Sequence, residues 1–427
     1  MSTIPLPERP HIEQMKKRAK EIGREFGIPL HKAQLNMARG YGFASWPKLA
    51  KHVEVVTALT REPETVAPDD FLALVCLTYG DDAPSRRSRG LDMLADSPSL
   101  ATRDIWSAAA TASAATVQRC IADASRQGGP FAWEPLMYLC YSRVPSIERD
   151  VLATASALLD AGADPNVGYL WHGLPSPFTA LTGVLGSGEA DQPAHEHWQS
   201  LARLLLERGA NANDPQTLYN RQFRPGQEHL ELLFEFGLGR GDGGPWRERL
   251  TAAMDSPGEM LRDQLRWAIH HNMLERVRLL AENGVDLNSP FDDPRFEHAY
   301  KQTPARFAAL CGNSRIVDEL AKHDAPVLGC SAPHALIGSV MCGWREAALS
   351  HARSRRKAIA ERPSLVVQAA ATGRKSAVRL AVERNDAEMV ESLLKLGADP
   401  SIEDARFHAT PKGWAEHFGH EAIAALF

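Results

Sequence analysis

The chain has 427 residues, more than one globular core usually holds, so we expect several domains or a stack of repeats. Hydrophobic residues make up 44% of it and charged residues 24%, which is typical of a folded protein and excludes general disorder. The net charge of -5 excludes a chain-wide attraction to nucleic acid or to an anionic membrane.

Targeting and membrane signals are missing from the sequence. The longest apolar runs fall well short of the roughly 20 residues that a membrane-spanning helix needs, and residues 1–9 lack the apolar core of a secretion signal. The six cysteines contain no C-x-x-C pair, which argues against a zinc knuckle or a redox motif. We therefore expect a cytoplasmic protein with no membrane partner and with reduced cysteines.

Residues 1–60 differ from the rest in charge, because 10 Lys and Arg stand against 5 Glu there. Apolar residues at helical spacing from Ile12 to Ile22 predict one helix, and residues 30–41 predict a second. Ser45 as N-cap and Pro47 in the first turn predict a third. We interpret residues 1–60 as a basic N-terminal helical cap on the remaining chain. The alternative is a small nucleic-acid module of the helix-turn-helix kind.

Residues 61–150 carry weaker signals. Helix pairs are expected over 106–128 and 132–141, but neither ends in the glycine-containing turn that marks the later units. We interpret 61–150 as degenerate helical repeats.

A short segment recurs in residues 151–427: a Leu-Leu pair, then Gly-Ala or Gly-Val, then Asp or Asn. The leucines end an amphipathic helix, the glycine supplies a left-handed conformation, and Asp or Asn builds the turn. The copies lie at 158–166, 204–213, 279–288 and 393–401, and their glycines are Gly162, Gly209, Gly284 and Gly397. Gly237 and Asp324 occupy two further anchor positions. Stretches 183–197 and 239–257 are expected to be loops between helices.

The segment before each ending predicts a short helix, a tight turn and a second helix. In residues 303–317, Thr303 can cap the first helix and Pro304 can take its first position. This unit resembles the ankyrin repeat, which opens with Thr-Pro-Leu-His-x-Ala and closes with Leu-Leu-x-x-Gly-Ala-Asp-x-Asn. Here Ala305-Arg306 and, in the last unit, Lys412-Gly413 replace the Leu-His pair, so the repeats are less regular.

The resemblance implies an all-α fold, an ankyrin-repeat solenoid of helix-turn-helix units with short finger loops, over residues 151–427. Some nine or ten units would follow the N-terminal cap if 61–150 is included. Residues 42–49, Gly-Phe-Ala-Ser-Trp-Pro-Lys-Leu, also resemble a short N-terminal segment of bacterial ankyrin-repeat proteins. That likeness suggests a bacterial source.

Ankyrin repeats imply a role as an adapter or regulatory protein that binds another protein, through the finger loops and the concave face. The predicted fingers carry aromatic and arginine side chains, the types that dominate interface hot spots, or a neighbouring histidine. These candidate partner contacts are Tyr169, Trp171, His172, Tyr219, Arg221, Phe223, Phe291, Arg295, Phe296, Tyr300, Arg406 and Phe407. Trp171 is the first choice among them. The alternative is that these side chains only pack the loops together.

Sequence motifs typical of enzymes are weak in this chain. Residues 239–244 fit G-x-G-x-x-G, but they follow a predicted helix rather than the strand that a dinucleotide site needs. Three pairs of histidines lie close together in the sequence: 195 and 197, 270 and 271, and 417 and 420. A metal site needs at least a third ligand, and the sequence shows none near these pairs. We expect no enzyme activity, no cofactor and no metal. An enzyme with a site assembled from distant residues remains the rival hypothesis.

Overall fold

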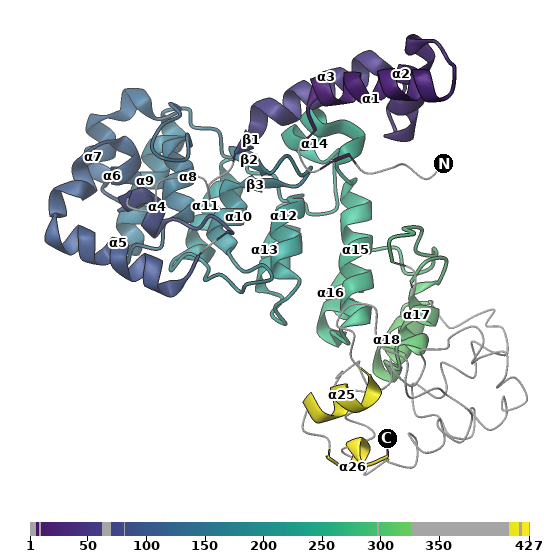
Figure 1. The fold of residues 1–427 in the computed structure, drawn as a ribbon. Coiled ribbons are helices and arrows are strands. Elements are labelled where there is room, and N and C mark those ends of the chain that lie inside the picture. Colours follow the sequence, from purple (N-terminus) through teal and green to yellow (C-terminus); the bar gives the residue numbers. More distant parts are fainter. Residues whose placement is uncertain are drawn as a thin grey trace, which may run out of the picture. The chain divides into compact units, whose positions relative to one another are not determined.

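The computed structural model describes residues 6–7, 10–61, 70–80, 82–296, 299–325, 410–417 and 421–426. These residues form mostly helices and one small three-stranded sheet. The chain divides into two compact units, Met1–Met260 and Leu261–Phe427, whose helices and strands are labelled in Figure 1. Within the described stretches, no helix is both long enough and apolar enough to cross a membrane.

The first unit begins with the three helices predicted for residues 1–60, here called the N-terminal element. They are α1 (Ile12–Glu25), α2 (Leu30–Gly40) and α3 (Trp46–Leu59). Each contacts the other two, and they share a small apolar core. Its buried members are Met15, Ala19, Met37, Ala38, Leu49 and Val53. Ser45 is the N-cap of α3 as predicted, although its side chain makes no capping hydrogen bond.

The rest of the first unit is built mainly from pairs of short helices. The pairs are α4 (Phe71–Val75) with α5 (Pro84–Asp96), α6 (Ile105–Ala110) with α7 (Ala114–Arg119), α8 (Pro135–Tyr141) with α9 (Glu148–Asp160), α10 (Ala180–Leu185) with α11 (Trp198–Glu207), and α12 (Pro215–Arg221) with α13 (Glu228–Glu235). Short 3-10 turns lie at Pro98–Thr102 and Ile121–Asp123. The helices predicted between 106 and 141 are thus present.

The helix pairs are arranged in two layers. The first helices contact their neighbours in sequence, α4 with α6, α6 with α8, α8 with α10, and α10 with α12. The second helices do the same from α7 to α9 and from α9 to α11. Each pair therefore buries its apolar faces against the next pair along the chain.

Each of the later second helices ends at a left-handed residue, as predicted. The φ angle is +92° at Gly162, +95° at Gly209 and +91° at Gly237, which favours glycine because it has no Cβ. After Gly162, the N–H of Ala163 donates to the carbonyl of Leu158, which closes the helix end. The local sequence alone specifies these stops.

A small sheet includes Tyr169 and Trp171, which the ankyrin resemblance placed in a finger loop. Strands β2 (Gly168–Trp171) and β3 (Pro177–Thr179) form an antiparallel hairpin, and β1 (Thr60–Arg61) pairs in parallel with β2. Thr60 lies opposite Leu170, and Arg61 lies opposite Trp171. The fold is therefore mostly helical but not purely α.

The loop predicted at residues 239–257 is a second correction. It contains α14 (Gly244–Leu250) and a 3-10 turn (Thr251–Ala253). Trp246 and Leu250, four residues apart on one helix face, are both buried. That apolar pair stabilises a helix in a stretch whose glycines and charges otherwise indicate a loop.

The second unit holds most of α15 (Pro257–His270), with α16 (Leu274–Glu282), α17 (Pro304–Leu310), α18 (Ser314–Lys322), α25 (Pro411–His417) and α26 (Glu421–Ala424). Thr303 caps α17 by accepting from the N–H of Arg306, as predicted. The chain is left-handed at Gly284, with φ +76°, and at Asp324, with φ +56°, so both anchor positions are confirmed. The ending predicted at 393–401 lies outside the described residues.

Candidate binding surface

Asparagine side chains join consecutive helix pairs of the first unit through hydrogen bonds to backbone groups. Asn166, after α9, donates to the carbonyl of Gly209 at 2.9 Å and accepts from the N–H of Asn211 at 2.8 Å. One pair further along, Asn213 accepts from the N–H of Gly239 at 2.8 Å. Because each contact ties one turn to the next, the turns are held in a fixed row.

A small, partly open hollow lies beside this row, with Asn166, Asn211 and Trp246 in its wall. Asp214 also lines it, and this carboxylate accepts from the N–H of Thr217 at 2.9 Å and from the hydroxyls of Thr179 and Thr182. Burial raises the pKa of Asp214 above its ordinary value. Its oxygens are occupied by protein donors, so Asp214 links α10 to α12 and caps α12.

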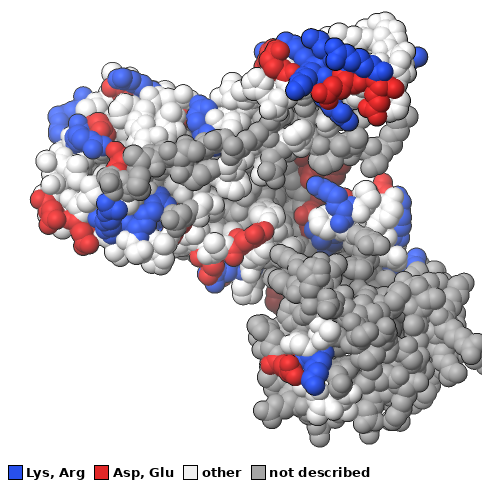
Figure 2. Space-filling model, viewed as in Figure 1, with Lys and Arg blue, Asp and Glu red and all other residues white. Residues whose placement is uncertain are grey.

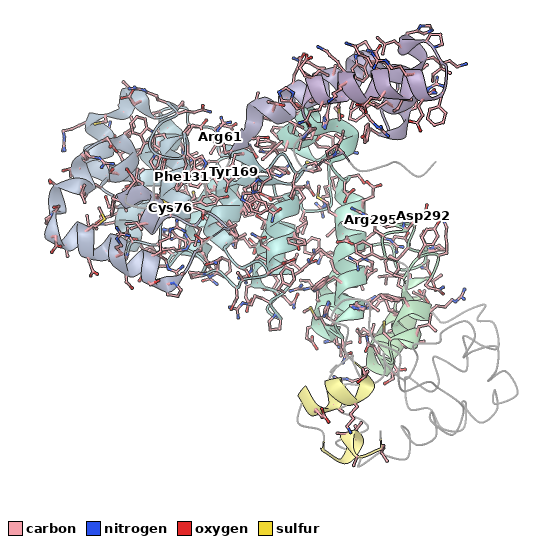
Figure 3. The ribbon with its side chains drawn as sticks, in the orientation of Figure 1. Arg61, Cys76, Phe131, Tyr169, Asp292 and Arg295 are labelled. Atoms are coloured by element: carbon pink, nitrogen blue, oxygen red, sulfur yellow. The ribbon has the colours of Figure 1, made fainter. Side chains whose placement is uncertain are left out.

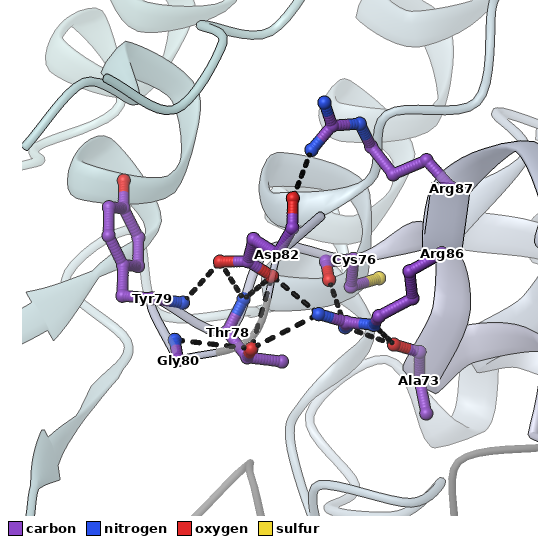
Figure 4. Close-up of polar contacts among 8 residues, drawn as sticks. All are labelled: Ala73, Cys76, Thr78, Tyr79, Gly80, Asp82, Arg86 and Arg87. Carbon is purple, nitrogen blue, oxygen red and sulfur yellow. Dashed lines mark hydrogen bonds and ion pairs between the residues drawn. The ribbon is translucent and has the colours of Figure 1, made fainter. Parts of the chain in front are cut away.

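Another buried carboxylate, that of Asp82, fixes the turn between α4 and α5 (Figure 4). It accepts from the N–H of Thr78 at 2.9 Å, from the N–H of Tyr79 at 2.6 Å and from the guanidinium of Arg86 at 2.6 Å. Arg86 also donates to the carbonyl of Cys76 at 2.9 Å. Both charges are satisfied internally, which indicates a structural role.

Tyr169 was predicted as a partner contact, and its place in the structure requires a correction. Its side chain is only 1% exposed, and its ring stacks on Trp133 at 5.2 Å and on Phe178 at 5.6 Å between centroids. Figure 3 shows it in the interior of the first unit with Phe131. Both Tyr169 and Leu170 of β2 are buried, so Tyr169 belongs to the aromatic core.

The turn of the β2–β3 hairpin carries the more accessible side chains. Trp171 and His172 are partly exposed, with 4.2 Å between ring centroids, and Leu174 is 36% exposed. The indole Nε1 of Trp171 is buried without an acceptor among the described residues. We call Trp171, His172 and Leu174 the hairpin tip. Sequence reasoning missed Leu174, although its position between Gly173 and Pro175 indicated an apolar residue in a turn.

A further correction concerns the second predicted finger, because its residues Tyr219, Arg221 and Phe223 do not lie in a finger loop. Tyr219 and Arg221 are on α12, and Phe223 follows it. Tyr219 is 41% exposed, its hydroxyl donates to Glu189 at 2.5 Å, and its ring lies 5.4 Å from that of Phe223. Burial lowers the pKa of Arg221, whose guanidinium lies 5.9 Å from the Trp198 ring centroid. These residues form a patch at the C-terminal end of α12, whereas the hairpin precedes the N-terminal end of α10.

The candidates in the second unit divide into buried and exposed residues. Phe291 is only 5% exposed and lies under the guanidinium of Arg262, 4.6 Å from its ring centroid, so it is also a core residue and not a surface contact. Phe296 is half-buried beneath Arg266, at 3.2 Å. Tyr300 is 37% exposed.

Arg295 is the most accessible arginine of the predicted set that the structure describes, with 73% of its side chain exposed. It pairs with Asp293 at 2.5 Å, and Figure 3 shows it beside Asp292 in the loop between α16 and α17. Arg406 and Phe407, the last two candidates, lie outside the described residues.

The histidines give no metal site within the described part of the chain, where no three His, Cys, Asp or Glu side chains gather suitably. His195 is 4% exposed, and its Nδ1 accepts from the N–H of His197 at 3.1 Å. Burial, followed by the charge of Arg143, lowers the pKa of His195 to about 3. Residues 239–244 follow α13, so the strand that a dinucleotide site requires is not before them.

Comparison with known proteins does not identify a function for the candidate binding surface. No protein-family model matches the chain, and no curated protein matches its sequence.

Proposed function

We propose that this protein is an ankyrin-type repeat protein that binds another protein through the hairpin tip. The observation that carries the proposal is the row of turns tied together by Asn166 and Asn213, from which the β2–β3 hairpin extends. A row held by hydrogen bonds between asparagine side chains and backbone groups is pre-organised, so little conformational entropy is lost when a partner binds.

The chemistry of the hairpin tip supports a protein partner. Tryptophan is among the residues most enriched in interface hot spots, and Leu174 adds an exposed apolar group beside it. His172 holds a left-handed conformation with φ +51°, which is uncommon for a residue with a Cβ. A strained turn with apolar side chains is typical of a loop that recognises a partner. The proposal involves no cofactor.

The patch at the end of α12 extends the proposed contact region to a second place on the repeats. Tyr219 presents a ring held by Phe223 and by the hydrogen bond to Glu189, so it would bind with little further ordering. The first helices between the two places are the concave face that the ankyrin resemblance implies. Both places supply aromatic contacts rather than catalytic groups.

The experiment compares two variants that each replace one exposed apolar residue by Glu. Leu174→Glu changes the hairpin tip, and Ile147→Glu, at a residue 64% exposed before α9, is the matched control. The tagged full chain and both variants are purified from source cells after nuclease treatment, and co-purified proteins are quantified by mass spectrometry. We expect one protein at near-equal amount with the wild type and with Ile147→Glu, and at least tenfold less with Leu174→Glu.

Equal recovery with all three chains would contradict the proposal. So would loss of the partner with both variants, because Ile147 belongs neither to the hairpin tip nor to the patch at the end of α12. Thermal melting of each variant shows whether Leu174→Glu acts on binding or on folding. Trp171→Ala provides a second test of the same turn.

A further inference from the structure

The N-terminal element has the order of a helix-turn-helix unit, two contacting helices joined by a short turn. Helices α2 and α3 contact each other and are joined by residues 41–45, while α1 packs on both. Gly42 has φ +84°, and the N–H of Phe43 donates to the carbonyl of Ala38 at 2.8 Å, so the chain reverses in a tight turn. A helix pair with such a short glycine-containing turn is the supersecondary unit that many DNA-binding proteins use.

The N-terminal half of α3 is accessible. The helix joins the rest of the first unit at its other end, where β1 follows it and pairs with β2, and it also packs on α14. A helix of 14 residues is about 20 Å long, so its first turns lie well away from that junction (Figure 1). Pro47, Lys48 and Lys51 are all exposed there.

The element carries cations that the described protein does not neutralise. Six of them form no ion pair with any described residue: Lys17, Lys20, Arg24, Lys32, Arg39 and Lys48. Figure 2 shows Lys and Arg side chains in a row along this element, with Asp and Glu beside them. Unpaired cations on an exposed helical surface attract a polyanion, because each phosphate they bind releases a condensed counterion.

We propose that the N-terminal element binds duplex DNA, with the first turns of α3 directed at the major groove. The proposal is independent of the partner proposed for the hairpin tip. Lys48 and Lys51, three positions apart, share one face of α3 and would contact phosphates and base edges, while Lys32 and Arg39 of α2 would contact the phosphate backbone. A groove about 12 Å wide admits one helix of this diameter.

The positions of the exposed apolar residues favour duplex DNA over a lipid surface as the partner of α3. Its exposed N-terminal positions are mainly cationic or small, and the exposed apolar residues of the element, Phe26 and Leu30, flank the α1–α2 loop instead. Glu54 is the acidic residue of α3, and it lies 3.7 Å from Lys51 with both side chains mostly exposed. An exposed pair of this kind is weak, so Lys51 can turn to a phosphate at little cost.

The test uses the full chain and fluorescence anisotropy with a labelled duplex of about 30 base pairs, at salt concentrations from about 50 to 200 mM. The variant Lys48→Gln/Lys51→Gln removes two charges from α3. Arg149→Gln/Arg240→Gln removes the same charge from exposed positions among the helix pairs and is the matched control. We expect the α3 variant to bind about tenfold more weakly and to lose about 2 from the salt slope, while the control stays near wild type.

Absence of duplex binding by the wild type at the lowest salt would overturn the proposal. Equal losses with the α3 variant and the control would also overturn it, because the effect would then be one of net charge. So would tighter binding to a single strand of the same sequence, or to vesicles containing phosphatidylserine, than to the duplex. Unchanged melting temperatures of both variants exclude unfolding as the cause of any loss.

Discussion

The N-terminal element and the helix pairs that follow it in the first unit are stabilised in different ways. The element has a small apolar core of its own and joins the rest through α3 and the two residues of β1. In the helix pairs, the buried carboxylate of Asp82 fixes the turn within the first pair, and polar contacts of Asn166 and Asp214 join later pairs to one another. Substitutions at exposed charges of the element should therefore alter binding, whereas substitutions inside the helix pairs should alter stability first.

The largest effect is expected from Asp82→Ala. This change leaves Arg86 buried without its carboxylate and removes the acceptor for two backbone N–H groups, so the free energy of unfolding should fall by about 3–5 kcal/mol. Asp92→Ala, at an exposed position of α5, is the control and should change it by less than about 0.5 kcal/mol. Urea denaturation followed by circular dichroism measures both. Similar losses from the two variants would contradict the structural role of Asp82.

A pH effect from His195 should be next in size. The pKa of the buried imidazole is lowered to about 3, so between that value and the ordinary value near 6.5 the unfolded chain binds one proton more. The contribution of neutral His195 to the free energy of unfolding is therefore complete above about pH 6.5. Below that pH it falls by about 1.4 kcal/mol per pH unit, down to the pKa of the folded state.

His195→Asn keeps an acceptor near the N–H of His197 and removes the titrating group. Urea midpoints at about pH 7.5 and 5.5 should therefore differ less in this variant than in the wild type. Equal differences would mean that other groups cause the pH dependence.

Asn166→Ala should have a smaller effect. It removes the hydrogen bonds to Gly209 and Asn211, and the loss of one exposed and one partly buried bond should lower stability by about 1 kcal/mol. Asn283→Ala is a matched control, because the Asn283 side chain donates to the Leu279 carbonyl of its own helix end and not to another helix pair among the residues that the structure describes. The melting temperature should fall clearly more for Asn166→Ala. The reverse order would show that the row of turns is not held by Asn166.

The smallest stability effect is expected from Lys48→Gln/Lys51→Gln. Both side chains are exposed, and the ion pair of Lys51 with Glu54 is long at 3.7 Å. The free energy of unfolding should therefore change by no more than about 0.5 kcal/mol, with a correspondingly small shift of the melting temperature. Differential scanning fluorimetry measures the shift. A large loss of stability would mean that these lysines support the fold, and would remove the contrast between the two regions.

Local signals in the sequence predicted the ends of the helices well. A glycine after a Leu-Leu pair needs no distant contact to adopt positive φ, and Gly162, Gly209, Gly237 and Gly284 all do so. Asp324 does the same without being glycine. The helices of the N-terminal element were predictable for the same reason, since their caps and apolar spacing are short-range features.

Features that depend on distant residues were not predictable in this way. The strand β1 exists because Thr60 and Arg61 meet Leu170 and Trp171, which no local pattern encodes. Tyr169 looked like a finger residue, but Trp133, supplied by a segment well before it in the chain, covers its ring. The candidate surface is therefore smaller than the aromatic and arginine residues of the sequence suggest.

Hydrogen–deuterium exchange of the full chain, alone and with the co-purified partner, tests the central claim of protein binding at the hairpin most directly. We expect the partner to slow exchange in residues 168–179 and at the C-terminal end of α12, and to leave α1, α2 and the first turns of α3 unchanged. Protection confined to the N-terminal element, with none at the hairpin, would contradict it.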